Sequence, residues 1–115
     1  MSLAARALAV LVGLVSAAAL ADIHETDGRG REIVLPRPAQ RIVSLAPMVT
    51  ELLFAAGAGE RVVGVTAFSD FPAPARRLPQ VGNSVSLDYE RILALRPDLV
   101  VSWGSGTNRD SIERI

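Results

Sequence analysis

Three short apolar segments, separated by two segments with helical spacing, constrain the fold of this chain most. The apolar segments are residues 41–45, 62–65 and 98–103. The first helical segment begins at Pro47 and the second covers residues 87–96, both with apolar residues at the spacing of a helix face. An alternation of strand, helix, strand, helix and strand predicts an α/β fold, a Rossmann-like layer with a largely parallel sheet.

Local residue chemistry predicts where these helices begin and end. Pro47 suits a first helical position, where its missing N–H is not needed, and Gly57 suits the end of the same helix. Ser86 is predicted to cap the second helix, with Asp88 in its first turn beside the positive end of the helix dipole. That second helix is predicted to bury one apolar face and expose the opposite one.

The predicted faces of the second helix follow from its spacing. Tyr89, Ile92 and Leu93 lie three and four residues apart and are predicted to face the core. Glu90 and Ala94 then point outward.

Shorter elements flank this pattern. Residues 24–36 read as a hairpin around the turn pair Asp27-Gly28. Residues 72–79 can hold at most a short helical turn, and Val81 is predicted to start a brief extended segment. A last helix is predicted after Thr107, its possible cap.

The N-terminus has the layout of a secretory signal peptide. One basic residue, Arg6, precedes the apolar stretch Ala7–Ala21, which ends in small residues that fit a cleavage site. A short membrane anchor is the alternative, but the stretch is shorter than the roughly 20 residues that span a bilayer. We therefore expect residues 1–21 to be removed, and residues 22–115 to be an exported domain. The last predicted helix has run for only about two turns when the sequence stops at Ile115. We therefore expect this domain to be the N-terminal part of a longer protein.

Composition excludes several classes of function. The chain has 12 basic and 12 acidic residues, and the predicted signal peptide removes only Arg6, so the charge balance gives no reason to propose nucleic acid or an anionic membrane as a partner. The absence of cysteine excludes disulfides and thiolate metal sites. His24 is the one histidine and would be alone as a metal ligand.

Apolar side chains follow the predicted strands, where open α/β sheets bind their ligands. The carboxyl ends of the strands lead into residues 46–48, 66–71 and 103–107. Large side chains in these segments favour a bulky, partly apolar ligand, although rings that cap the core remain the alternative. The side chains concerned are Met48, Phe68, Phe71 and Trp103.

Enzyme motifs match poorly. Gly104 and Gly106 follow a strand as in a dinucleotide-binding loop, but Arg109 stands where the third glycine belongs. No phosphate-binding P-loop and no G-x-S-x-G motif occurs, and His24 is remote from every predicted strand end. We therefore expect a protein without catalytic activity, with a nucleotide-binding α/β enzyme as the alternative.

Three stretches carry a resemblance to a known family. They are the S-x-x-P-x-x-T-E pattern at residues 44–51, the loop FSDFP at 68–72, and L-x-x-E-R-I-x-A-L-x-P-D-L-V at 87–100. With these motifs, residues 33–115 resemble the N-terminal lobe of the periplasmic binding proteins that serve ABC importers of vitamin B12, haem and iron-siderophores.

The resemblance implies a two-lobed binding protein in the periplasm, with a long helix joining lobes that close on a ligand by a small movement. This chain would supply the first lobe and the beginning of that helix. One lobe alone should bind weakly, because it lacks half of the contacts that remove the ligand from water.

Within this family the cobalamin-binding type is matched best. There, the residues at the positions of Phe68 and Trp103 contact the corrinoid ligand. Phe68 stands where tyrosine is common, and Ser84 stands where a second tryptophan would be expected. The resemblance implies the ligand-binding set Met48, Phe68, Ser69, Asp70, Phe71, Ser84, Trp103 and Gly104.

Haem and ferric siderophores are the alternative ligands. Haem-binding relatives use a tyrosine or histidine of this lobe, whereas Tyr89 is predicted on a helix face and His24 near the terminus. Arg76 and Arg77 would suit an acidic siderophore. The resemblance further implies that Glu90 docks onto arginines of the membrane permease.

Overall fold

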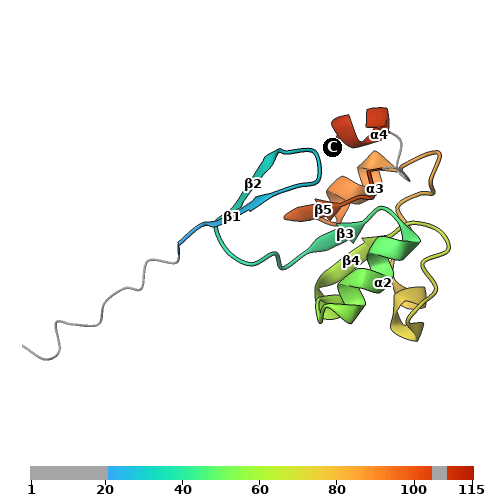
Figure 1. Ribbon diagram of the computed structural model, residues 1–115. Helices are drawn as coiled ribbons and strands as arrows, with labels where there is room; N and C mark the ends of the chain where they lie inside the picture. The colour runs from blue at the N-terminus through green and yellow to red at the C-terminus, as the bar shows by residue number, and fades with distance from the viewer. Residues whose placement is uncertain (1–20, 105–108) are drawn as a thin grey trace, which may run out of the picture.

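A three-stranded parallel sheet forms the centre of the computed structural model, which describes residues 21–104 and 109–115. The strand order is β4 (Val62–Val65), β3 (Ile42–Ser44), β5 (Leu99–Val101), with β3 parallel to both neighbours (Figure 1). The predicted α/β architecture is therefore confirmed. The predicted signal peptide, apart from Ala21, and the predicted cap Thr107 lie outside the described residues.

Helical segments connect the strands as the alternation predicted. Pro47 occupies the first turn of its helix as expected. The segment after β4 holds only a short 3-10 turn, also as expected. In chain order the helical elements are α2 (Pro47–Ala55), η1 (Gly59–Arg61), η2 (Ala73–Arg77), α3 (Tyr89–Ala94) and α4 (Arg109–Glu113).

Side chains alternate between the two faces of the sheet along each strand, and a buried apolar cluster lies on each face. Toward α3, the buried cluster consists of Val43, Leu45, Val81, Leu87 and Ile92. Toward α2, it consists of Ala39, Ile42 and Ala58, with Leu53, Leu99 and Val101 packed against it. All three residues of β5 are only half-buried, since this strand is at the edge of the sheet.

A register shift between Ile42 and Val43 makes room for a glycine. Ile42 pairs with Val62, whereas Val43 pairs with Gly64. A Cβ atom at Gly64 would lie 2.7 Å from Cδ1 of Leu95. The missing side chain at Gly64 therefore lets Leu95 pack directly on the sheet.

The segment after η2 extends the sheet beyond β4. The N–H of Val65 donates to the carbonyl of Pro79 at 2.9 Å, and the N–H of Ala67 donates to that of Gly82 at 2.8 Å. Residues 79–82 thus run alongside β4 in the parallel sense. They form the brief extended segment that was predicted near Val81. The sheet consequently presents four neighbouring carboxyl ends.

Helix α3 differs from its prediction at both ends. Its N-cap is Asp88, whose Oδ1 accepts the N–H of Arg91 at 3.0 Å, and not Ser86. Ile92 is buried and Tyr89 half-buried as predicted, but Leu93 is 72% exposed. The helix is too short to bury a wide face, so the prediction for Leu93 was wrong.

The predicted hairpin consists of β1 (Ile23–Thr26) and β2 (Glu32–Leu35), paired in the antiparallel sense. Figure 1 shows it set beside the parallel sheet. Residues 27–31 connect the two strands, so the turn is longer than a two-residue turn. Within it, Asp27 Oδ1 accepts the N–H groups of both Arg29 and Arg31. His24 lies in β1, and its Nδ1 is 2.8 Å from Glu32 Oε1.

Asp98 joins the beginnings of β3 and β5. Its carboxylate accepts the N–H of Gln40 at 2.9 Å and that of Arg41 at 2.8 Å. The N–H of Gln40, and next that of Arg41, hold the pKa of the Asp98 carboxyl below its ordinary 3.8, against the opposing effect of partial burial. Asp98 therefore favours the folded state in its ionised form.

The lowered pKa predicts a loss of stability in acid. A carboxylate with a depressed folded-state pKa contributes stability above its unfolded-state pKa, and this contribution is lost as the pH falls through the folded-state value. The thermal midpoint should therefore fall below about pH 4, and less steeply in Asp98→Asn. Circular dichroism melts between pH 7 and pH 2 measure this. Glu60→Gln serves as the control, and equal slopes in the two variants would contradict the assignment.

Candidate functional site

Loops from four neighbouring strand ends form one surface, which we call the carboxyl-end face. It comprises residues 45–48 after β3, 66–71 after β4, 82–86 after the segment beside β4, and 102–104 after β5. All residues of the predicted ligand-binding set belong to these segments, with Met48 in the first turn of α2. The parallel sheet therefore gathers them at one edge, although they are spread over more than fifty positions of the sequence.

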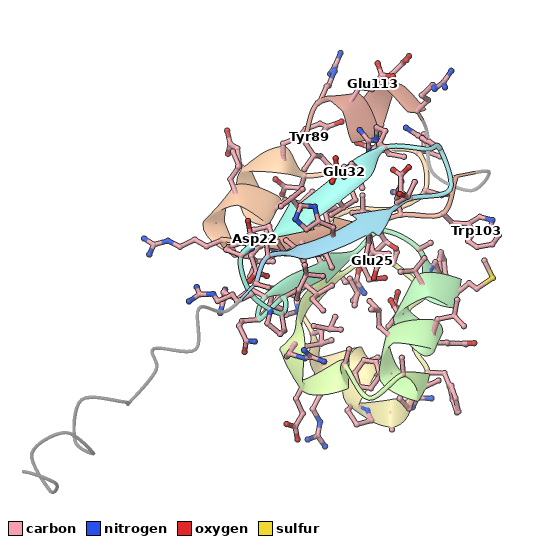
Figure 2. The ribbon with its side chains drawn as sticks, turned by 60° about the vertical axis from the view of Figure 1, so that its left-hand side comes forward. Asp22, Glu25, Glu32, Tyr89, Trp103 and Glu113 are labelled. Carbon is pink, nitrogen blue, oxygen red and sulfur yellow. The ribbon has the colours of Figure 1, made fainter. Side chains whose placement is uncertain are left out.

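The large apolar side chains of this face are exposed. Phe68 is 82% exposed and Phe71 66% exposed, and Met48 and Trp103 are close to half-exposed. Figure 2 shows Trp103 projecting outward from the body of the molecule. The alternative that these rings cap the core is therefore wrong, most clearly for the two phenylalanines.

Phe68 adopts a backbone conformation that is uncommon for a phenylalanine. Its φ is 68°, in the left-handed region where side chains other than glycine, asparagine and aspartate are rare. The loop is held on both sides of this residue, by the Ala67 N–H bonded to Gly82 and by Ser69 below it. These attachments keep the ring outside the core.

Ser69 points inward. It is 4% exposed, and its Oγ accepts a hydrogen bond from Thr50 Oγ1 at 3.1 Å. Ser44 Oγ lies 2.8 Å from the same Thr50 oxygen. We call Ser44, Thr50 and Ser69 the hydroxyl cluster. Sequence reasoning placed Ser69 in the ligand-binding set; the structure places its hydroxyl on Thr50, and any ligand contact by Ser69 stays a prediction.

Sequence reasoning missed Thr50 and Ser44. Both are fully buried, although polar side chains are uncommon in that position. Their signal was the S-x-x-P-x-x-T-E spacing, which carries one hydroxyl at the end of β3 and the other within the first turns of α2. A strand that turns directly into a helix brings these two positions together.

Asp70 and Arg76 complete the loop. Arg76 Nε donates to the backbone carbonyl of Asp70 at 3.0 Å, so this arginine holds the loop that carries Phe68 and Phe71. The Asp70 side chain is exposed and is the one charged group in the predicted ligand-binding set. A face so rich in apolar surface and so poor in charge suits a large ligand held mainly by contact area.

Ser84 and Val85 form the tip of the loop after Gly82, and both are exposed. Asn83 Oδ1 accepts the N–H groups of Val85 and Ser86, each at 2.9 Å, which closes the turn. Sequence reasoning did not single out Val85, which is 81% exposed and adds to the apolar surface of the carboxyl-end face.

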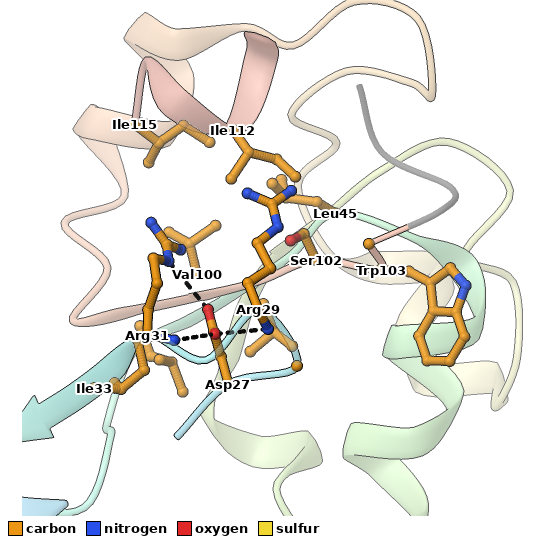
Figure 3. A pocket seen from close by; sticks show the side chains of 14 residues that line it. Asp27, Arg29, Arg31, Ile33, Leu45, Val100, Ser102, Trp103, Ile112 and Ile115 are labelled. Carbon is orange, nitrogen blue, oxygen red and sulfur yellow. Dashed lines mark hydrogen bonds and ion pairs between the residues drawn. The ribbon is translucent and has the colours of Figure 1, made fainter. Parts of the chain in front are cut away.

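A cavity of about 650 Å³ lies between the hairpin turn, β5 and the end of the chain. Arg29 and Arg31 extend toward Ile112 and Ile115 across it, while Asp27 binds Arg31 (Figure 3). Of the predicted ligand-binding set, only Trp103 and Gly104 line this cavity. The cavity therefore adjoins the β5 end of the carboxyl-end face and does not contain the two phenylalanines.

The one tyrosine and the one histidine of the chain are engaged elsewhere. The Tyr89 hydroxyl donates to the carbonyl of Ser111 at 3.3 Å, and His24 pairs with Glu32 in the hairpin. Within the described part of the chain, no group of three or more acidic or histidine side chains is placed to hold a metal ion. Over the same residues, no helix has the length and apolarity needed to cross a bilayer.

Comparisons with known proteins agree with one another. A family model described as periplasmic binding protein matches residues 42–115. A vitamin B12-binding protein of Pectobacterium carotovorum subsp. carotovorum is 45% identical over 76 residues, which cover 66% of this chain and 28% of that protein. One of Vibrio campbellii is 44% identical over 78 residues, 68% of this chain and 28% of that protein.

Solved structures are similar as well. The periplasmic vitamin B12 binding protein BtuF of Vibrio cholerae superposes with a TM-score of 0.65 at 42% identity, over 67% of this chain and 30% of that one. The heme binding protein HmuT superposes with a TM-score of 0.68 at 29% identity, over 87% of this chain and 33% of that one. The chain thus spans less than a third of the length of the vitamin B12-binding relatives that it matches.

Proposed function

Because this chain belongs to the periplasmic binding protein family, a family of transport proteins and not of enzymes, we propose that it forms the N-terminal lobe of a protein that binds cobalamin or a related corrinoid and delivers it to an ABC permease. The family match argues against the alternative of an enzyme that binds a nucleotide at Gly104–Gly106. The predicted signal peptide, residues 1–21, would direct the protein to the periplasm.

The observation that carries this proposal is the exposed apolar surface of the carboxyl-end face. Four adjacent segments of this face offer exposed rings and aliphatic or thioether side chains, those of Phe68, Phe71, Met48, Val85 and Trp103. A corrinoid is large enough to cover such a surface, and burial of apolar area is favourable by about 25 cal/mol per Å². Similarity to vitamin B12-binding proteins of several bacteria supports the same ligand.

Haem is the second candidate, favoured by the superposition on heme binding protein HmuT over 87% of the chain. A tyrosine or histidine that ligated haem iron from this lobe would have to lie on the carboxyl-end face. Tyr89 contacts Ser111 and His24 contacts Glu32, away from that face. This distribution favours the corrinoid.

Parallel titrations test the ligand. The full-length protein is titrated with cyanocobalamin, haemin and a ferric siderophore, with calorimetry and tryptophan fluorescence as readouts, because Trp103 lies on the proposed site. Saturable binding of cyanocobalamin with quenching of Trp103 supports the proposal. Saturable binding of haemin or of the siderophore alone would keep the family and overturn the corrinoid.

Glu90 is the proposed contact with the permease. It is exposed near the start of α3, and no other described residue forms an ion pair with it. Exposed charge pairs contribute little affinity but orient an encounter and accelerate it. Glu90→Ala should therefore slow ligand uptake by about ten-fold while leaving ligand affinity unchanged.

Uptake by cells that depend on this transporter, together with calorimetry on the purified variant, measures the two effects. Glu60 is another exposed glutamate, in η1, and Glu60→Ala is the matched control that should alter neither. Loss of ligand affinity in Glu90→Ala would overturn the docking role.

A further inference from the structure

We propose that the hydroxyl cluster is a positioning device that sets the direction of Phe68. Ser44, Thr50 and Ser69 are not themselves required to touch the ligand for this role. The expected effect on ligand affinity rests on the proposed function. The expected effect on the conformation of the loop after β4 does not depend on any ligand.

The hydroxyl cluster joins three separate elements. Ser44 ends β3, Thr50 lies in α2, and Ser69 lies in the loop after β4. Ser44 Oγ and Thr50 Oγ1 are 2.8 Å apart, and Thr50 Oγ1 is 3.1 Å from Ser69 Oγ. Because all three side chains are at least 95% buried, water does not compete for these bonds.

The number of hydroxyl hydrogens determines which residue of the hydroxyl cluster donates to which. Each hydroxyl has a single hydrogen to donate. If Thr50 donates to Ser69, it can still accept from Ser44, and both contacts are then made at once. The carbonyl of Ala46, 3.1 Å from Ser44 Oγ and 3.3 Å from Thr50 Oγ1, is the alternative acceptor. Among the hydrogen bonds of the described residues, the one from Thr50 to Ser69 is the one that joins the loop after β4 to α2.

The direction of Phe68 follows from this tie. Ser69 is drawn inward by Thr50 while Ala67 is fixed to Gly82 at 2.8 Å. The residue between them reaches both attachments with a φ of 68° and an exposed ring. Without the bond from Thr50, the backbone at Phe68 can return to a common conformation. The ring then leaves the position in which it faces the ligand.

Limited proteolysis tests the loop without any ligand. Chymotrypsin cleaves after phenylalanine but not before proline, so Phe71-Pro72 is resistant and Phe68-Ser69 reports opening of the loop. Cleavage of the full-length protein after Phe68 should become about ten-fold faster in Thr50→Val, which has the shape of threonine without its hydroxyl. Mass spectrometry of the fragments identifies the cleaved bond.

Two variants serve as controls. Thr50→Ser keeps the hydroxyl, and its cleavage after Phe68 should equal that of the unmodified protein. Ile92→Val loosens the core on the α3 side, and it should not accelerate cleavage at Phe68-Ser69 more than cleavage at other sites. Equal cleavage in Thr50→Val and Thr50→Ser, or an increase in Thr50→Val at all sites alike, would overturn the proposal. Should Thr50→Val fail to fold, Ser69→Ala removes the other partner of the same bond.

Ligand affinity tests the link to function. With cyanocobalamin as the probe, Thr50→Val should weaken binding about ten-fold, yet cause no further loss in a Phe68→Ala background. Additive losses would overturn the link between Thr50 and Phe68. If the unmodified protein does not bind cyanocobalamin while proteolysis still selects Phe68-Ser69, the proposed ligand fails and the positioning role stands.

Discussion

Alanine in place of Phe68 is expected to weaken the binding of cyanocobalamin to the full-length protein by about thirty-fold, which corresponds to about 2 kcal/mol. The ring is 82% exposed in the unbound chain, so a ligand that covers it removes most of its apolar area from water. Calorimetry measures the affinity, and Trp103 remains in the variant to report binding by fluorescence.

The matched control for this prediction is Leu93→Ala. Leu93 is another large apolar side chain, 72% exposed, but it lies on α3 and not on the carboxyl-end face. Its removal should leave the affinity within two-fold of the unmodified protein, roughly the scatter of additive surface changes. Equal losses in Phe68→Ala and Leu93→Ala would contradict the placement of the ligand at Phe68.

Alanine in place of Gly82 is expected to reduce the free energy of unfolding by about 3 kcal/mol or more. Gly82 has a φ of 128°, and a Cβ atom there would clash with the carbonyl oxygen of Ser86 and lie 2.8 Å from Leu87 Cα. Both obstacles are backbone atoms, and the Ser86 carbonyl is fixed by the N–H of Asn83 at 2.8 Å. The backbone must therefore shift, and the loop that carries Ser84 shifts with it.

Urea and thermal unfolding followed by circular dichroism measure the effect. Gly28→Ala is the matched control, because nothing lies within 4 Å of a Cβ atom at Gly28. We expect its free energy of unfolding to change by less than about 0.5 kcal/mol. A similar small change in Gly82→Ala would show that the segment beside β4 is more adaptable than its close contacts indicate.

The layout of the fold was predictable because apolar periodicity decides it. The segments at 41–45 and 62–65 are short, apolar and bounded by turn residues, and they became β3 and β4. Pro47 was decisive for the start of α2, since proline suits the first turn of a helix but not its interior. That the segments carrying Phe68 and Trp103 lie at the same edge of the sheet followed from parallel strands alone.

Other features depended on contacts distant in sequence. The pairing of Val43 with Gly64 depends on how Leu95 packs, which no local pattern contains. Leu93 has the spacing of a core residue, yet α3 is too short to cover it. Thr50 resembles any polar residue within a helix until the loop after β4 brings Ser69 against it. These features are set by tertiary packing, which overrides local preference.

The left-handed backbone of Phe68 has a consequence for the evolution of such proteins. A phenylalanine held at a φ of 68° costs stability on the order of 1 kcal/mol, and glycine at the same position would relieve that cost. Selection for stability alone would therefore favour glycine or asparagine at this position, and under the proposed function selection for ligand binding would retain a ring there. Under the proposed function, natural variants of this chain that keep an aromatic residue at position 68 should bind the ligand, whereas variants with glycine there should bind it weakly.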